Sequence, residues 1–214
     1  MKIKALTLGI LLAGASATQA ATVKEVFNGD MLGTNQRYFE SIAGVPRESF
    51  GNDHIFRVQN CQITATIGNG KVTALRMDLA KGCQPDLQSF IGEDAPKVGQ
   101  PITPGAFGRG LRYTADCLSQ CGNAADPSAY ALWSAPRSSG AVEVLLEMVL
   151  VDGKALDAAD QWETQMKEAA GEDYVMNTKF NCETRFDKVA EAAFKDVPAT
   201  AITIGYDLPT QRCN

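Results

Sequence analysis

The sequence predicts an α+β fold in which helices pack on one face of a mainly antiparallel sheet. Three observations lead to this prediction. Runs of alternating apolar and polar residues, typical of half-buried strands, are joined by short turns. Apolar residues elsewhere recur every three or four positions, as in amphipathic helices. An even number of cysteines, six in all, indicates a fold stapled by disulfides if the chain is exported.

The composition of the chain excludes some classes of function. The chain has 214 residues, 45% of them hydrophobic, and a formal net charge of −5. Domains commonly have about 100–200 residues, so this length suits one domain or two small ones. The acidic balance argues against nucleic-acid binding, which needs a basic stripe to neutralise phosphates. A single histidine, His54, excludes most histidine-based metal sites.

The first twenty residues have the pattern of a secretory signal peptide. A basic start is followed by an apolar run over 5–15 and then by small residues up to Ala20 and Ala21. That run is too short to span a bilayer, which requires about twenty residues. We therefore expect cleavage between Ala20 and Ala21, giving a soluble periplasmic or secreted protein with no membrane span or lipid anchor. Cleavage would remove Lys2 and Lys4, so the formal net charge of the mature chain becomes −7.

The first part of the mature chain predicts a helix followed by a hairpin. The helix covers 34–43, with Thr34 as its cap and Gly44 as its end. Residues 54–67, rich in β-branched side chains, predict one strand, and 71–79 predict the next. An Asn-Gly turn joins these two strands.

The rest of the chain predicts a second set of elements after a connector over 80–110 that is dense in Gly and Pro. These elements are a strand over 111–117, hairpin strands over 130–134 and 141–151, helices over 156–170 and 183–195, and a strand over 201–208. In the strand over 141–151, Glu143 and Glu147 lie opposite the core face, which indicates a partly covered or interacting surface. We expect one mature domain, 21–214, with two helix-plus-hairpin submodules over 21–90 and 100–214.

The cysteine spacing predicts three disulfides. Cys117 and Cys121 are the closest pair and precede a loop-like run, where a turn can bring their Cα atoms within about 7 Å. By proximity, the expected bonds are Cys117–Cys121, Cys182–Cys213 and Cys61–Cys83. The last of these requires a turn at Lys81-Gly82, because a simple hairpin would place Asp78 opposite Cys61.

Residues 31–79 resemble a known type of small α/β module. The stretch Met31-Leu32-Gly33-Thr34 is followed by Phe39, by Ile42-Ala43-Gly44-Val45-Pro46, and by Asn69-Gly70-Lys71-Val72 between strands. This succession resembles outer-membrane assembly lipoproteins of the SmpA/OmlA (BamE) type and β-lactamase-inhibitor-protein folds. The resemblance implies a short helical entry, a three-stranded meander and relatives that mostly bind proteins. The chain departs from the lipoproteins in lacking a lipobox cysteine.

No residue pattern in the sequence completes a catalytic or metal site. The sequence therefore predicts a non-catalytic protein without cofactors that binds another protein of the cell envelope, as an assembly factor or an inhibitor. Trp133 and Arg137, at the loop between the hairpin strands, are candidate interface residues because Trp and Arg are favoured at interfaces. Packing of Trp133 beneath the hairpin is the alternative.

Two other functions are hypotheses from the sequence. Cys117 and Cys121 could serve in a thiol-redox or copper-handling protein, because soft thiolates bind Cu(I). A structural disulfide is the competing interpretation, which an oxidising compartment favours. The third hypothesis is a hydrolase of unrecognised type that uses His54 as its base, although no nucleophile or orienting carboxylate is evident in the sequence.

Overall fold

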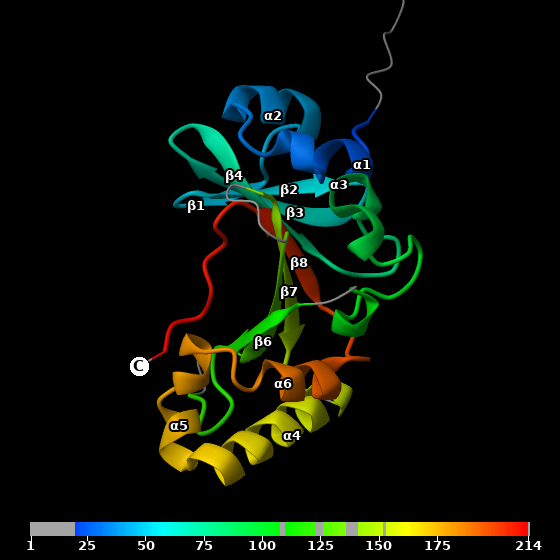
Figure 1. The fold of residues 1–214 in the computed structure, drawn as a ribbon. Helices are drawn as coiled ribbons and strands as arrows, with labels where there is room; N and C mark the ends of the chain where they lie inside the picture. Colours follow the sequence, from blue (N-terminus) through cyan, green and yellow to red (C-terminus); the bar gives the residue numbers. More distant parts are fainter. Residues whose placement is uncertain (1–19, 108–109, 123–125, 136–140, 152, 214) are drawn as a thin grey trace, which may run out of the picture.

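The computed structural model describes residues 20–107, 110–122, 126–135, 141–151 and 153–213. Within these ranges eight strands form one antiparallel sheet in the order β1-β2-β3-β4-β8-β7-β6-β5 (Figure 1). The strands are β1 Glu48–Phe50, β2 Asp53–Val58, β3 Cys61–Gly68, β4 Lys71–Asp78, β5 Arg112–Ala115, β6 Ser128–Ser134, β7 Glu143–Val149 and β8 Ala201–Gly205. The predicted α+β class and the mainly antiparallel sheet are confirmed.

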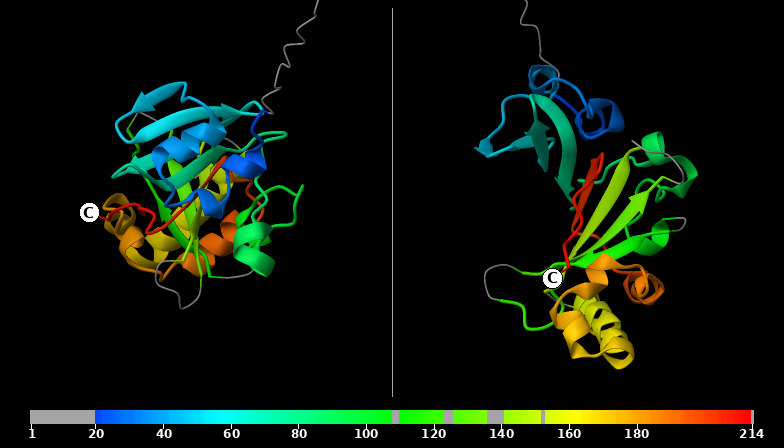
Figure 2. Two further views of the ribbon diagram at one scale, coloured as in Figure 1. Left: turned by 90° about the horizontal axis from the view of Figure 1, so that it is seen from above. Right: turned by 60° about the vertical axis from the view of Figure 1, so that its left-hand side comes forward.

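Helices and 3₁₀ turns complete the described chain. The α-helices are α1 Val23–Val26, α2 Gln36–Ala43, α3 Gln88–Ile91, α4 Gly153–Ala170, α5 Glu172–Met176 and α6 Asp187–Phe194. The 3₁₀ turns are η1 Gly29–Met31, η2 Gly92–Asp94, η3 Pro104–Ala106 and η4 Lys179–Cys182. Figure 2 shows that the twist of the sheet carries α1 and α2 to one end of the molecule and α4–α6 to the other.

One face of the sheet forms the hydrophobic core. A row of paired residues crosses six strands on this face and is fully buried: Ile63, Met77, Ile202, Leu146, Ala131 and Tyr113. At one end of the sheet Phe39 of α2 meets Phe56 of β2 edge to face, with ring centroids 5.1 Å apart. At the other end Trp162 of α4 packs edge to face against Tyr113, at 6.4 Å between ring centroids. Such aromatic pairs add to the stabilisation that burial itself provides.

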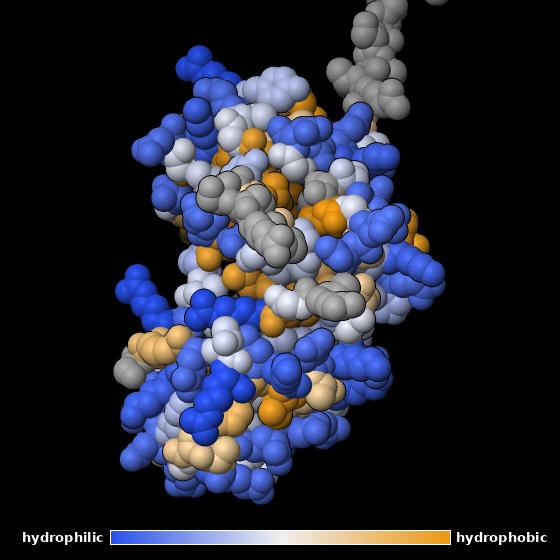
Figure 3. Space-filling view, viewed as in Figure 1, coloured by the Kyte–Doolittle hydropathy of each residue, from blue (hydrophilic) through white to orange (hydrophobic). Residues whose placement is uncertain are grey.

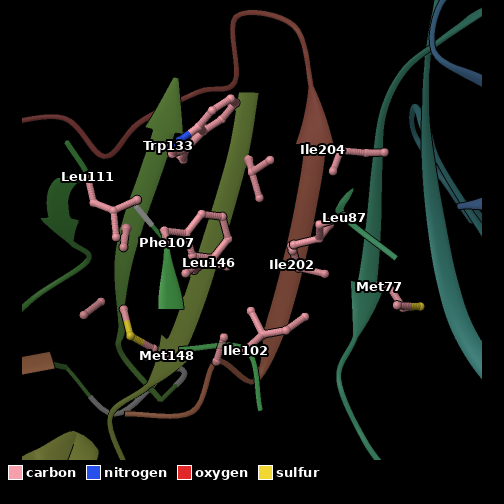
Figure 4. Packing of buried hydrophobic residues seen from close by; sticks show 14 of the residues in the cluster. Met77, Leu87, Ile102, Phe107, Leu111, Trp133, Leu146, Met148, Ile202 and Ile204 are labelled. Carbon is pink, nitrogen blue, oxygen red and sulfur yellow. The ribbon is translucent and has the colours of Figure 1, made fainter. Parts of the chain in front are cut away.

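The connector predicted over 80–110 contributes to the core. It contains α3, η2 and η3, and its side chains Leu87, Ile102 and Phe107 are almost fully buried. Figure 4 shows these three residues beside Met77 and Leu146 in the middle of the sheet. In the view of Figure 3, hydrophilic side chains cover most of the surface and apolar ones are seen mainly across its middle.

The single strand expected over 54–67 is two strands in the structure. β2 and β3 are joined by a two-residue turn at Gln59 and Asn60, which have φ angles of 48° and 67°. Glutamine rarely adopts this left-handed conformation, and neither turn position holds a glycine. The sequence therefore carries no clear signal for this turn. A tertiary contact supports it, because the N–H of Val23 donates to the Gln59 side chain at 2.9 Å.

Two helix starts also differ from expectation. α2 is capped by Asn35, whose side chain accepts the N–H of Arg37 at 2.9 Å, and not by Thr34. The Thr34 hydroxyl donates to the carbonyl of Met31 at 2.7 Å and is therefore occupied. The helix expected over 183–195 begins at Asp187, because the preceding residues form η4 and the turn after it.

All three predicted disulfides are present: Cys61–Cys83, Cys117–Cys121 and Cys182–Cys213, with Cα–Cα distances of 5.4, 5.6 and 5.5 Å. The required turn at Lys81-Gly82 exists, since Ala80 and Cys83 exchange backbone hydrogen bonds across it. Gly82 has a φ of 85°, which only glycine adopts without strain. Loop-closure entropy predicts about 2 kcal/mol of stabilisation from the shortest loop and about 3–4 kcal/mol from each of the other two.

The outer edge of β5 is closed by side chains from the helical layer. Asn181 of η4 accepts the N–H of Ala115 at 3.0 Å and donates to the carbonyl of the same residue at 2.9 Å. One carboxylate oxygen of Asp187 accepts the N–H of Tyr113 at 3.2 Å. These side chains occupy the positions that a further strand would take, which blocks edge-to-edge pairing at β5.

We expect Asn181→Ala to lower the free energy of unfolding by about 2–4 kcal/mol, because the buried N–H and C=O of Ala115 both lose their partner. Chemical denaturation in urea measures this loss. Asn177→Ala is the matched control, since Asn177 is exposed and its substitution should change stability by less than about 0.5 kcal/mol. Equal effects of the two substitutions would contradict the edge-closing role.

The carboxyl of Asp187 predicts a pH dependence. Burial, reinforced by the nearby Glu191 charge, raises its pKa to about 6 from an ordinary value of 3.8. The folded state therefore favours neutral Asp187, and this stability is present below about pH 4 and lost as the pH rises through about 6. Asp187→Asn keeps the acceptor for Tyr113 N–H, so the variant should match wild type near pH 4 and exceed it at pH 7.

Urea denaturation from pH 4 to 8 tests this expectation, with the exposed Asp160→Asn substitution as the control. A stability profile of Asp187→Asn that runs parallel to the wild-type profile across this range would refute it.

Candidate functional site

The second face of the sheet is mostly half-buried and is here called the open face. It is defined by two rows of paired residues, one being Thr64, Arg76, Thr203, Leu145, Leu132 and Arg112, and the other Asp78, Ala201, Glu147, Tyr130 and Thr114. In contrast to the core row, most of these side chains keep contact with solvent. This is the face on which the sequence places Glu143 and Glu147.

Arg76 lies at the centre of an ion-pair network on the open face. Its guanidinium donates from Nη2 and Nε to one carboxylate oxygen of Glu147, at 3.0 and 3.2 Å, and also pairs with Asp78. The second oxygen of Asp78 accepts from Gln62 at 2.9 Å. Burial alone would lower the pKa of Arg76, but the Glu147 and Asp78 carboxylates raise it above its ordinary value. The guanidinium of Arg76 therefore stays positively charged, and its hydrogen bonds to Glu147 link β4 to β7 across β8.

A smaller polar cluster lies toward β6. The hydroxyl of Tyr130 donates to Asp116 at 3.1 Å, and the same carboxylate oxygen accepts the N–H of Ser128 at 3.0 Å. Burial, followed by the Asp116 charge, raises the pKa of Tyr130 to about 12. Tyr130 is therefore a hydrogen-bond donor at neutral pH and is poorly suited to act as a base.

A cavity of about 390 Å³ opens on this face. Its walls come from β2, β3, β4, β7 and β8, and from Tyr206–Pro209 after β8. Arg76, Thr203 and Leu145 are among the residues that line it, and Asp53 and Asp207 add two carboxylates. The volume falls within the range of sites that bind small molecules or single side chains.

Residues 206–213, here called the C-terminal strap, begin where the expected strand over 201–208 ends early at Gly205. The Leu208 N–H donates to the Glu143 carboxylate at 2.7 Å, and its side chain is 7% exposed. A Cβ at position 205 would lie 2.5 Å from Leu208 Cδ2, so Gly205 permits this close approach. Figure 1 shows the strap in red, running from the end of β8 to the C-terminal mark.

His54 lies on β2 near the edge of the sheet. Its Nδ1 is 3.0 Å from the Ser49 hydroxyl on β1, a partner that sequence reasoning missed. In the part of the chain that the structure describes, no carboxylate hydrogen-bonds the ring. A serine nucleophile requires a base oriented by a third group, so this pair alone does not assemble the hydrolase of the third hypothesis.

Of the two predicted interface residues, the structure describes only Trp133. Trp133 is 5% exposed and lies on the core face, paired with Val144 and shown among core residues in Figure 4. A side chain this buried offers almost no contact area to a partner. Arg137 lies outside the described residues.

Cys117 and Cys121 are joined in the structure, so neither sulfur is a free thiolate. Across the described ranges, His, Cys, Asp and Glu side chains do not gather in threes that could hold a metal ion. Among the same residues, no helix combines the length and the apolar character that a membrane span requires.

Comparison with protein-family models, with curated proteins and with solved structures finds no match for this chain.

We expect Arg76→Gln to lower the free energy of unfolding by about 1–3 kcal/mol at pH 7, because two partly buried carboxylates lose their counter-charge. Salt screens partly exposed charges, so the loss should shrink as the NaCl concentration rises to about 1 M. Arg57→Gln is the matched control, since Arg57 is an exposed residue of β2. Urea titrations at low and high salt measure the difference, and a loss that is independent of salt concentration would contradict the electrostatic role of Arg76.

Proposed function

We propose that this protein acts without catalysis, by binding a partner protein of the cell envelope through the open face of its sheet. The observation that carries the proposal is the cavity beside the Arg76 ion-pair network. Its walls are mainly strands paired on both sides, so the contact groups are held by backbone hydrogen bonds before any partner arrives. Preorganisation of this kind reduces the entropy lost on binding.

The charges of the cavity favour a basic partner segment. The positive charge of Arg76 is already balanced by Glu147 and Asp78, which leaves Asp53 and Asp207 as acceptors in the cavity wall. The formal charge of −7 after removal of Lys2 and Lys4 has the same sign and would steer a cationic partner toward the protein.

Exposed aromatic rings on the same face support the same partner chemistry. Tyr206 lines the cavity and is 41% exposed. Phe50 is 66% exposed and pairs across β1 and β2 with Asp53, a cavity residue. Arginine and lysine side chains stack on aromatic rings while their charges pair with carboxylates. An extended segment with alternating basic residues would meet both kinds of group.

The cellular role that we propose is that of an envelope assembly factor or an inhibitor, in the periplasm after removal of residues 1–20. The resemblance of residues 31–79 to modules with such roles supports it. The three disulfides are compatible with a compartment outside the cytoplasm.

A pair of peptides tests the proposed site. An acetylated, amidated hexapeptide of alternating Arg and Ser should shift the amide resonances of Thr203, Tyr206 and Leu145 in the mature protein. Asp207→Asn should weaken its binding by about two- to five-fold, the range expected for a partly exposed ion pair. Asn tolerates the left-handed φ of 50° at this position, so the backbone should be preserved.

Two controls accompany this titration. The corresponding Glu-Ser hexapeptide should cause no shifts at the open face, and Tyr38→Ala, at an exposed ring of α2, should leave binding of the Arg-Ser peptide unchanged. Shifts confined to other surfaces, or equal binding of the two peptides, would overturn the proposal.

A further inference from the structure

We propose that the Cys182–Cys213 disulfide is a redox control of the open-face site, because it fixes the strap that forms one wall of the cavity. The inference rests on the binding role proposed above and adds a means of regulating it. Reduction of this bond would release the strap and weaken binding while the sheet stays folded.

The strap is held firmly at its two ends and lightly between them. At one end it continues from β8, which is paired with both β4 and β7. At the other end Cys213 is bonded to Cys182 of η4. Residues 208–213 have no regular secondary structure. The covalent bond is therefore the main restraint on the free end of the strap.

Few non-covalent contacts hold the strap between these ends. The Leu208 N–H donates to Glu143 at 2.7 Å, and the carbonyl of Arg212 accepts from Thr178 at 3.3 Å and from Asn181 at 3.2 Å. Leu208 is the one strap residue of the described chain that is buried. Hydrogen bonds of this kind are individually worth about 1 kcal/mol and do not fix a chain end when its cross-link is opened.

The cavity depends on this segment. Tyr206, Asp207, Leu208 and Pro209 all line it, and they supply its exposed aromatic ring and one of its two carboxylates. The binding groups proposed above are thus divided between a rigid part on the strands and the first residues of the strap, which are held by β8 and Leu208 on one side and by the disulfide at Cys213 on the other.

The three disulfides differ in their accessibility to a reductant. Cys61 and Cys83 are 1% and 8% exposed, which shields that bond. Cys117, Cys121 and Cys213 are half-buried, and Cys182 is the one exposed cysteine of the described chain, so a reductant meets the Cys182–Cys213 bond from the Cys182 side. Thiol–disulfide exchange requires such an approach.

The reductant is a dithiol, either a small molecule or a dithiol protein. One of its thiolates attacks the sulfur of Cys182 and forms a mixed disulfide, releasing Cys213 as a thiolate that takes up a proton. The second thiol of the reductant then loses its proton and attacks the mixed disulfide. This step closes the disulfide of the reductant and releases Cys182 as a thiol. Two electrons and two protons pass from the reductant to the protein.

A matched pair of double variants isolates the strap. Cys182→Ser with Cys213→Ser opens the bond that holds it, whereas Cys117→Ser with Cys121→Ser opens a bond that closes only its own short loop. Both are made in the mature chain and compared with wild type by hydrogen–deuterium exchange without any peptide. We expect faster exchange at 207, 208 and 210–213 in the first variant, and unchanged exchange there in the second.

The same three proteins are then titrated with the Arg-Ser hexapeptide. We expect about tenfold weaker binding in the Cys182/Cys213 variant, since the strap loses its preorganised position, and wild-type binding in the Cys117/Cys121 variant. Should the first variant not fold, wild type is reduced by stepwise addition of dithiothreitol, with mass spectrometry identifying the bond that has opened.

The outcomes separate the two proposals. Failure of wild type to bind the peptide would refute the binding role. Wild-type binding that survives opening of Cys182–Cys213, or becomes tighter, would refute redox control through the strap. Equal exchange at the strap in all three proteins, or opening of Cys61–Cys83 before Cys182–Cys213, would refute it as well.

Discussion

The pairing of β8 with β4 on one side and β7 on the other is the constraint on which the whole structure depends. The last strand in the sequence, β8, lies near the middle of the sheet, between β1–β4 on one side and β5–β7 on the other (Figure 1). Its register pairs Thr203 with Arg76 and with Leu145. Without this strand the two halves would share no backbone hydrogen bonds within the sheet, and neither the core row nor the open face would be continuous.

The side chains of β8 fit the different environments of the core face and the open face. Ile202 and Ile204 are fully buried on the core face, where they link Met77 and Leu75 to the side chains of β7. On the open face, the small side chains of Ala201 and Thr203 leave room for the guanidinium of Arg76 to extend over β8. Larger residues there would separate Arg76 from Glu147. Gly205, at the end of the strand, allows Leu208 to pack back against the sheet and start the strap.

Local signals in the sequence predicted the parts of the fold that depend on neighbouring residues. The Asn69-Gly70 turn, the apolar stripe of α4 around Trp162 and the three disulfides all follow from spacing that is visible in the chain. The turn at Gln59-Asn60 was missed because glutamine rarely adopts a positive φ and no glycine marks the turn, and the contact that supports it comes from Val23. Contacts of this type cannot be read from a window of adjacent residues.

The candidate site was predictable only in part, for the same reason. Alternation in the strand that became β7 placed Glu143 and Glu147 away from the core, but it could not show that Arg76 would reach Glu147 across a strand formed by residues 201–205. Trp133 was a reasonable interface candidate by composition, yet its register beside Val144 puts it in the core. Register decides both outcomes: that of a hairpin for Trp133, and that of a strand distant in the sequence for Arg76.

Native-state hydrogen exchange at the amides of Ile202, Thr203 and Ile204 tests the central position of β8 most directly. Because the strand is paired on both sides, these amides should be among the slowest in the protein and should exchange only through global unfolding, with the full dependence on urea concentration. Rapid exchange that is independent of urea, as at an edge strand such as β1, would contradict the account.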